Sequence, residues 1–220
     1  MVSKTAKNKI DHDSHLSGAL AEAVSTLQGG GYVMLLDNED RENEGDLVMA
    51  AEFVQPEHIT FMAESCRTIV CLAIHGSRLD ELDIPMMVEE NTSTYGTPFT
   101  RSIDIKDSRI SGSSAEDRAR TIKALLDDTY AADDFCSPGH VFPLRAHKKG
   151  LLERDGHTEG AVALATIARL YPAALISEVQ NAEGKMMRGT ELIKFARVCN
   201  APLIHISEIK DYLLKSGSYR

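Results

Sequence analysis

The stretch from Tyr32 to Ala51, YVMLLDNEDRENEGDLVMAA, sets the pattern around which the rest of the chain is arranged. Its two ends, residues 32–36 and 47–51, are apolar runs of strand length, and its centre crowds carboxylates around one arginine, Arg41. Carboxylates held this close repel one another unless a cation lies between them. Such oxygen ligands suit Mg²⁺, so the loop is either a metal site between two strands or an acidic turn that faces water.

The composition is that of an ordinary globular protein and narrows the possible partners. The chain has 220 residues, of which 43% are hydrophobic and 26% charged. Its net charge of −9 argues against a general nucleic-acid surface, although a local basic pocket for a phosphate remains compatible with it. The four cysteines lack metal-type spacing, which predicts reduced thiols in a cytoplasmic protein. No apolar run approaches the roughly 18 residues of a membrane span, so we expect no membrane association.

Apolar periodicity predicts the fold class. Residues 15–28 repeat apolar side chains at helical spacing, and residues 69–74 form a continuous apolar run typical of a buried strand. Further helices are expected at 56–65, 78–82, 115–126, 156–170, 191–199 and 207–214, and further strands at 141–146, 151–154, 174–179 and 203–206. This irregular alternation predicts an α/β (α+β) sandwich, a mixed β-sheet flanked by helices.

The domain organisation follows from the same pattern. Residues 1–14 are polar and are expected to form a flexible N-terminal tail, which leaves residues 15–220 as a single catalytic domain. Residues 86–98 form a long polar loop, and loops of this length are usually functional or disordered.

Residues 154–159, Arg-Asp-Gly-His-Thr-Glu, open one of the expected helices and could bind an anion. A helix start exposes unpaired N–H groups, and Arg154 and Thr158 add a guanidinium and a hydroxyl that suit a phosphate. The other interpretation is that Thr158 only caps the helix. His157 is either a metal ligand through its neutral imidazole or a surface residue.

Two isolated titratable residues are candidates for proton transfer. His140 follows Pro138 and Gly139 in an expected turn at residues 136–140, where it either acts on a substrate or is satisfied by the backbone. Glu178 ends an apolar strand, where it either has a raised pKa and acts as a base or reaches water. Residues 111–114, followed by Arg118, form either a second anion site or a capped helix, and the Ser114/Asp117 spacing favours capping.

Several long motifs, taken together and in order, resemble the 3,4-dihydroxy-2-butanone 4-phosphate synthase family of riboflavin biosynthesis. They are DRENEGD at residues 40–46, PMMVEENTS at 85–93, GSSAEDR at 112–118, PGHVFPLR at 138–145, RDGHTE at 154–159, YPA at 171–173, and Glu178. The resemblance covers nearly everything from residue 20 to residue 207. The HExxH, P-loop and GxGxxG patterns are absent.

The resemblance implies an activity, cofactors and a quaternary structure. The reaction would convert ribulose 5-phosphate to 3,4-dihydroxy-2-butanone 4-phosphate and formate with Mg²⁺ or Mn²⁺, two divalent ions per site, in a homodimer whose sites lie near the subunit interface. It also implies the roles of individual residues. Glu42 and His157 would bind metal, His140 and Glu178 would be catalytic, and substrate would be bound by Arg41, Glu42, Asp46, Arg154, Asp155, Gly156, His157, Thr158 and Glu178.

The chain departs from the family pattern in two places and leaves two other functions open. Residues 64–68 replace a glycine-containing basic segment, and residues 109–111 replace a threonine-richer one. The chain ends at Arg220 without a second enzymatic domain, so we expect one activity. The alternatives are another metal-dependent enzyme acting on a sugar phosphate, such as an aldolase or isomerase, and a non-catalytic protein that binds a phosphorylated metabolite.

Overall fold

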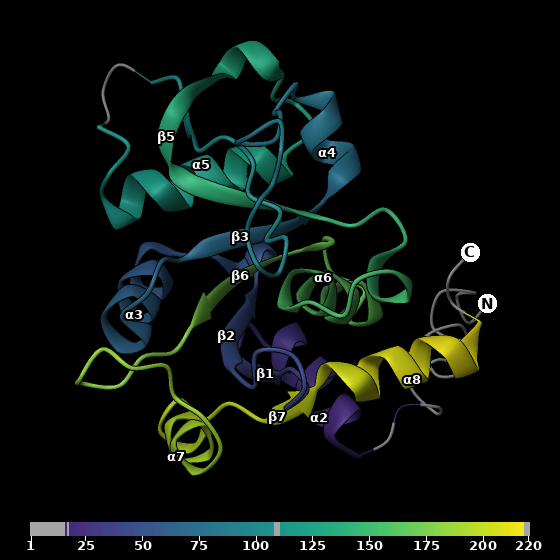
Figure 1. Cartoon of the computed structure of the whole chain (residues 1–220). Coiled ribbons are helices and arrows are strands. Elements are labelled where there is room, and N and C mark those ends of the chain that lie inside the picture. The colour runs from purple at the N-terminus through teal and green to yellow at the C-terminus, as the bar shows by residue number, and fades with distance from the viewer. Residues whose placement is uncertain (1–15, 17, 108–110, 218–220) are drawn as a thin grey trace, which may run out of the picture.

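The computed structural model describes residue 16, residues 18–107 and residues 111–217. Its centre is a seven-stranded mixed sheet with the strand order β4-β5-β3-β6-β2-β1-β7 (Figure 1). The predicted tail at residues 1–14 lies outside the described residues, as do residues 109 and 110 of the second departure from the family pattern. The predicted mixed sheet flanked by helices is confirmed.

The strands combine parallel and antiparallel pairing. They are β1 (Val33–Leu36), β2 (Gly45–Ala50), β3 (Cys71–His75), β4 (Ile103–Ile105), β5 (Phe135–Ala146), β6 (Ala173–Glu178) and β7 (Leu203–His205). β1 with β7 and β3 with β5 are parallel, and the other neighbouring pairs are antiparallel. The centre of the sheet is therefore the antiparallel group β3, β6, β2 and β1, which contains both ends of the acidic loop.

Helices cover both faces of the sheet, with a hydrophobic core on each side. One core contains side chains from α2 (Gly18–Gln28), α6 (His157–Ile167) and α8 (Ile206–Ser216). The other contains side chains from α3 (Pro56–Cys66), α4 (Gly76–Glu81), α5 (Ala115–Leu126) and α7 (Thr190–Val198). Short 3-10 turns complete the structure at η1 (Ala51–Phe53), η2 (Ala132–Asp134) and η3 (Gly150–Leu152).

Strand β2 shows why the sequence produces two cores. Leu47 and Met49 point into one core and Val48 and Ala50 into the other, because successive side chains of a strand alternate between its faces. All four are fully buried. Burial of side chains the size of Leu or Met stabilises a fold by about 1.5–3 kcal/mol each, so β2 anchors the acidic loop firmly at its C-terminal end.

The expected turn at residues 136–140 is wrong, because these residues lie inside the long strand β5. Pro138 and Gly139 suggested a turn, but proline is tolerated where a strand does not need its N–H. Gly139 is required for close approach, since a Cβ there would lie 2.0 Å from the carbonyl carbon of Ile103 in β4. His140 is thus held on a strand and not on a turn.

Two further expectations about local structure are wrong. Residues 151–154 do not form a strand, because η3 occupies Gly150–Leu152 and the Arg154 N–H donates to the Gly150 carbonyl at 3.2 Å. The last helix does not begin at residue 207, because the buried Ile206 is already its first residue. The N-cap is His205, whose N–H donates to the Glu208 carboxylate at 3.1 Å.

Candidate active site

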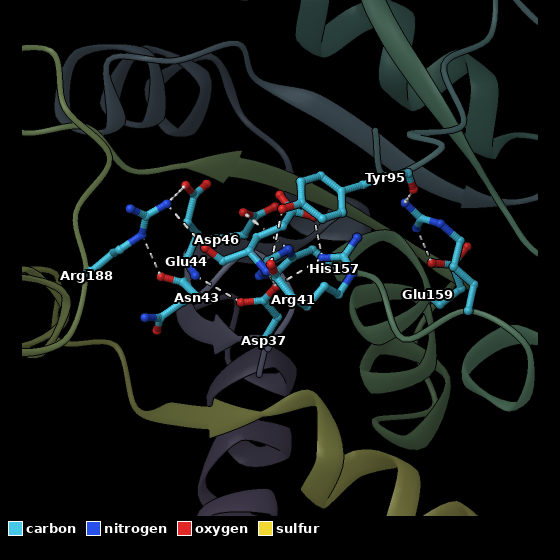
Figure 2. Close-up of polar contacts among 11 residues, drawn as sticks. Asp37, Arg41, Asn43, Glu44, Asp46, Tyr95, His157, Glu159 and Arg188 are labelled. Atoms are coloured by element: carbon cyan, nitrogen blue, oxygen red, sulfur yellow. Dashed lines mark hydrogen bonds and ion pairs between the residues drawn. The ribbon is translucent and has the colours of Figure 1, made fainter. Parts of the chain in front are cut away.

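Asp37, immediately after β1, organises the acidic loop. Its Oδ2 accepts hydrogen bonds from the Glu42 N–H and the Arg41 guanidinium, both at 3.0 Å, and its Oδ1 accepts one from the Glu44 N–H at 2.9 Å (Figure 2). Asn43 adopts a left-handed conformation with φ of 55°, which lets the chain reverse between Glu42 and Glu44. The buried carboxylate of Asp37 therefore fixes the direction in which the loop presents its other acids.

Two groups of possible metal ligands meet at Glu42. Ligand atoms of Asp37, Glu42 and His157 all lie within 4.8 Å of one another, and so do those of Glu42, Glu44 and Glu178. The sheet causes this proximity, since Asp46 of β2 pairs directly with Glu178 of β6. A carboxylate shared by two such groups fits a pair of divalent cations, which prefer oxygen ligands and accept neutral imidazole.

Two buried polar atoms in the same region lack a hydrogen-bond partner within the described part of the chain and could bind a cation. Asp46 Oδ1 and His157 Nε2 are buried and have no hydrogen-bond partner among the described residues. Burial lowers the pKa of His157, which favours the neutral imidazole that can bind metal. Burial, reinforced by the neighbouring carboxylates of Glu42, Asp37 and Glu44, raises the pKa of Asp46 well above its usual range.

Glu178 has the pKa of a proton carrier in the metal-free protein. Its side chain reaches solvent at the end of β6, but the surrounding protein removes part of its hydration. This desolvation, followed by repulsion from Asp46, Glu44 and Glu42, raises the pKa of Glu178 to about 7. Glu178 reaches water at the strand end, as one of the two interpretations of the sequence expected, and its role in proton transfer stays a prediction.

The start of α6 forms another part of the site, and its first residue, His157, lies beside the acidic loop. Gly156 is the N-cap residue and makes no side-chain cap, so the helix does not begin through capping by Thr158. Thr158 is buried, with 3% of its surface exposed, and with Arg154 it lines the same hollow as the acidic loop. The helix start thus offers N–H groups, a hydroxyl and a guanidinium together.

One hollow of about 210 Å³ joins the acidic loop to this helix start. Seven of the predicted site residues line it: Arg41, Glu42, Asp46, Arg154, His157, Thr158 and Glu178. Its apolar wall includes Ile69, Phe99 and Leu144. The volume suits a small polar metabolite, and the wall carries both acidic and basic side chains.

Three predicted site residues lie outside the lining of this hollow. Asp155 forms an ion pair with Lys210, with oxygen-to-nitrogen distances of 2.7 and 2.9 Å. Gly156 lies against the Arg154 side chain, since a Cβ at Gly156 would be 2.1 Å from Nη1 of Arg154. His140 is on β5, where its Nδ1 lies 2.7 Å from Asp104 Oδ2 and its backbone N–H donates to Asp104 Oδ1 at 2.9 Å. His140 is therefore oriented by a carboxylate and not only by backbone groups.

The structure supports capping over a second anion site at residues 111–114. Ser114 is the N-cap of α5, and its hydroxyl accepts a hydrogen bond from the Asp117 N–H at 3.0 Å. The departure at residues 64–68 has a structural role, since the Thr68 hydroxyl lies 2.8 Å from the Ser177 hydroxyl and also donates to the Glu178 carbonyl. That segment thus supports the strand end from which Glu178 projects.

Two residues that contact the site's loop were not predicted from the sequence. They are Tyr95, whose ring centroid lies 5.4 Å from the Arg41 guanidinium carbon, and Arg188, whose guanidinium donates to Glu44 at 2.7 Å and to the Asn43 carbonyl at 3.2 Å (Figure 2). Asp37 was expected among the carboxylates around Arg41, but its hydrogen bonds to the loop were not predicted. Tyr95 could have been found as the aromatic residue of a long polar loop. Arg188 gives no signal, because 144 residues separate it from Glu44.

A mixed sheet that places metal-type ligands beside a helix start is the architecture of a metal-dependent α/β enzyme. The model of the 3,4-dihydroxy-2-butanone 4-phosphate synthase family matches residues 21–212, and the chain belongs to this family. Within the described residues, no helix combines the length and apolar character needed to cross a membrane.

Named relatives and solved structures agree with this family. The chain is 47% identical over 203 residues to "Riboflavin biosynthesis protein RibBA" of Synechocystis sp., covering 91% of this chain but 36% of that protein. It is 44% identical over 191 residues to the 3,4-dihydroxy-2-butanone 4-phosphate synthase of Desulfotalea psychrophila, covering 87% and 89%. A crystal structure of a 3,4-dihydroxy-2-butanone 4-phosphate synthase with two magnesium ions superimposes with a TM-score of 0.84 at 35% identity, covering 93% of this chain and all of that one.

Proposed function

We propose that the chain is a lyase that converts ribulose 5-phosphate to 3,4-dihydroxy-2-butanone 4-phosphate and formate, a step of riboflavin biosynthesis. The observation that supports this most strongly is the hollow in which two metal-type clusters face the helix start of Arg154 and Thr158, in a chain of this family. The atoms of the two products add up to those of the substrate, so no oxidant or other co-reactant is consumed.

Glu42 and His157 are the proposed protein ligands of a divalent cation, Mg²⁺ or Mn²⁺, with Glu44 and Glu178 near a second ion. The support is the pair of clusters that share Glu42 and the unpartnered nitrogen of the buried His157. A related protein crystallised with two magnesium ions is consistent with this. When bound, a divalent cation supplies a Lewis acid for sugar oxygens, a contribution of several kcal/mol to transition-state stabilisation.

Arg154, Thr158 and the first N–H groups of α6 are the proposed phosphate site. The support is that Arg154, Thr158 and the start of α6 line the same hollow as the acidic loop, and that the Arg154 guanidinium adds a positive charge that attracts a phosphate. A sugar phosphate then lies across the hollow, with its sugar oxygens toward Glu42 and its phosphate toward α6. Arg41 and Asp46 also line the hollow, and they are the proposed contacts of the sugar hydroxyls.

Glu178 is the proposed proton carrier, because it belongs to the carboxylate cluster at the strand end and also lines the hollow. Proton transfer by a positioned side chain typically contributes 10²- to 10⁴-fold to a rate. His140 is the second proposed catalytic group. Its bond to Asp104 favours the tautomer with hydrogen on Nδ1, which leaves Nε2 to exchange a proton with a substrate.

We further propose a homodimer in which His140 of one copy completes the hollow of the other. The support is that His140 does not line the hollow of its own chain and that its side chain is 49% exposed on β5. The test mixes two separately inactive variants, Glu42→Gln and His140→Ala. Shared sites restore about a quarter of the parental activity after subunit exchange, because half of the dimers are mixed and each has one intact site. No recovery would place His140 in the site of its own chain.

The proposed activity is tested by formate release from ribulose 5-phosphate by purified protein, with Mg²⁺, with Mn²⁺ and with excess chelator. We expect formate only when a divalent ion is present. Conversion of ribulose 5-phosphate without formate would identify an aldolase or isomerase, and binding without conversion would identify a binding protein. We also propose that residues 15–220 contain this one activity and that the protein is cytoplasmic; all four cysteines are free thiols, which supports a reducing compartment.

A further inference from the structure

Glu159 is a buried carboxylate in the first turn of α6 that the proposed mechanism does not use. Only 1% of its surface is exposed, and it does not line the hollow that holds the other site residues. A buried charge is costly unless it is paired and hydrogen-bonded. The hydrogen-bond partners of Glu159 therefore indicate its role.

Each oxygen of Glu159 has a different partner. Oε2 accepts a hydrogen bond from Nη1 of Arg154 at 2.6 Å, and Oε1 accepts one from the backbone N–H of His147, after β5, at 2.9 Å. Nη2 of Arg154 donates in turn to the Tyr95 carbonyl at 3.2 Å. Both terminal nitrogens of Arg154 are thus held by acceptors from different parts of the chain.

Gly156 shows that the space around this ion pair is also fixed. A Cβ at Gly156 would lie 2.1 Å from Nη1 of Arg154 and 2.8 Å from Oε2 of Glu159. Its φ of −103° is accessible to any residue, so conformational freedom does not require glycine here. The absence of a side chain at Gly156 leaves the room in which the guanidinium meets the carboxylate.

We propose that Glu159 is a positioning residue for substrate binding, which holds the Arg154 guanidinium at the edge of the hollow in the orientation that engages the substrate's phosphate. This inference rests on the proposed phosphate site at Arg154. Arg154 lines the hollow and Glu159 does not, so Glu159 acts only through Arg154. A guanidinium that is already oriented loses less rotamer freedom when an anion binds, and the anion binds more tightly as a result.

The test compares Glu159→Gln and Gly156→Ala with Arg154→Ala. Glu159→Gln keeps the size of the side chain and an acceptor for the His147 N–H, but it removes the charge that holds Arg154. Gly156→Ala keeps the carboxylate and pushes the pair apart, so it remains informative if Glu159→Gln does not fold. For both variants we expect the KM for ribulose 5-phosphate and the inhibition constant of inorganic phosphate to rise about tenfold, with kcat changed less than about twofold.

A control separates this effect from simple loss of stability. Arg78 is a buried arginine of α4 that donates to the carbonyls of Leu125, Asp127 and Tyr130 at 2.8 to 3.0 Å, away from the hollow. Arg78→Gln should lower the thermal midpoint and leave both the KM and the phosphate inhibition constant at parental values. A rise of KM in this control equal to that of Glu159→Gln would overturn the inference.

The outcomes distinguish the inference from the proposed phosphate site. If Arg154→Ala leaves the KM and the phosphate inhibition constant unchanged, the phosphate lies elsewhere and the proposed site is wrong. If Arg154→Ala raises both while Glu159→Gln and Gly156→Ala raise neither, the phosphate site stands and the inference fails. In the double variant with Arg154→Ala, Glu159→Gln should add no further rise in KM, because a positioning residue has nothing left to position.

Discussion

The two ends of the hollow differ in how well their polar atoms are satisfied without a ligand. At the acidic end, Asp46 Oδ1 and His157 Nε2 are buried without hydrogen-bond partners among the described residues, and desolvation together with neighbouring carboxylates raises the pKa of Glu178. At the helix end, Arg154 is fixed between Glu159 and Tyr95. The acidic end therefore carries an electrostatic cost in the free protein, whereas the helix end is already arranged for an anion.

This difference indicates how a ligand at each end affects the stability of the fold, substrate affinity and turnover. A divalent cation at the acidic end relieves repulsion among Glu42, Glu44 and Glu178, so its binding should stabilise the fold as well as the reaction. A phosphate at the helix end meets groups that do not have to rearrange, so changes there should alter affinity more than turnover. Four predictions test this contrast, and they are given in order of decreasing effect.

Glu42→Gln should have the largest effect, because Glu42 belongs to both ligand clusters. Loss of a contribution of several kcal/mol lowers the rate of formate release by at least about a thousandfold. The metal affinity of the variant is measured by calorimetry beside its turnover. Glu39→Gln, on the exposed part of the same loop, is the matched control and should retain parental activity. A Glu42→Gln enzyme with near-parental turnover would remove the metal site from the acidic end.

Glu178→Gln should lower kcat by about a hundredfold while metal and substrate binding stay nearly parental. The amide keeps the shape of the side chain but cannot carry the proton. Steady-state kinetics and metal titration are measured on the same preparation, with the exposed Glu183→Gln as control. Loss of metal binding would instead make Glu178 a metal ligand, and near-parental kcat would leave His140 as the better candidate for proton transfer.

Thr158→Val should act on affinity and not on turnover. A hydrogen bond to a charged group is worth about 1.5–3 kcal/mol, so loss of the hydroxyl raises the KM for ribulose 5-phosphate roughly tenfold or more, with little change in kcat. Thr166→Val is the matched control, since its hydroxyl donates to the Val162 carbonyl at 2.8 Å at the other end of α6. A fall in kcat without a rise in KM would contradict the assignment of substrate affinity to the helix end and of turnover to the acidic end.

The smallest effect is a pH dependence of stability in the metal-free protein. The pKa of Glu178 is raised to about 7 in the folded state from an unfolded value of 4.5, so the folded state binds more protons between these values and stability falls as pH rises. The raised pKa of Asp46 acts in the same direction as that of Glu178, whereas the lowered pKa of His157 acts in the opposite direction, an effect that fades as pH rises above its unfolded value of 6.5.

The measurement is therefore made between pH 6.5 and 8. In chelator, Glu178 should lower the thermal midpoint across this range by an amount on the order of 1 °C. Saturating Mg²⁺ should flatten the dependence, and Glu178→Gln should make it shallower. A parent in chelator and a Glu178→Gln variant with the same slope would show that Glu178 does not titrate in this range.

Much of the fold and of the hollow follows from local sequence. The apolar runs before and after the acidic loop predicted β1 and β2, and the helix start at residue 156 predicted α6. The strand through Pro138 was missed because proline and glycine are read as turn residues, whereas here Gly139 serves the close approach of Ile103. Local patterns are decisive where propensity and burial agree, and they fail where the sheet overrides propensity.

The features of the site that the sequence did not predict depend on contacts between distant segments. Arg188 forms an ion pair with Glu44 of the acidic loop, and Glu159 forms one with Arg154. No sequence spacing predicts the Arg188 contact or the role of Glu159. The family resemblance supplied the roles of His140 and Glu178, but the position of His140 outside the hollow depends on the register of β5 against β4. Such placements depend on tertiary packing, which single-sequence periodicity does not contain.

The pairing of Asp46 with Glu178 has a consequence for the order of events during synthesis. These two residues face each other across β2 and β6 but are separated by roughly 130 positions in the chain. At about 5–20 residues per second, the ribosome needs on the order of ten seconds to make the segment between them. The acidic loop therefore leaves the ribosome well before its partner strand exists, and a nascent chain cannot assemble the carboxylate cluster until synthesis has passed β6.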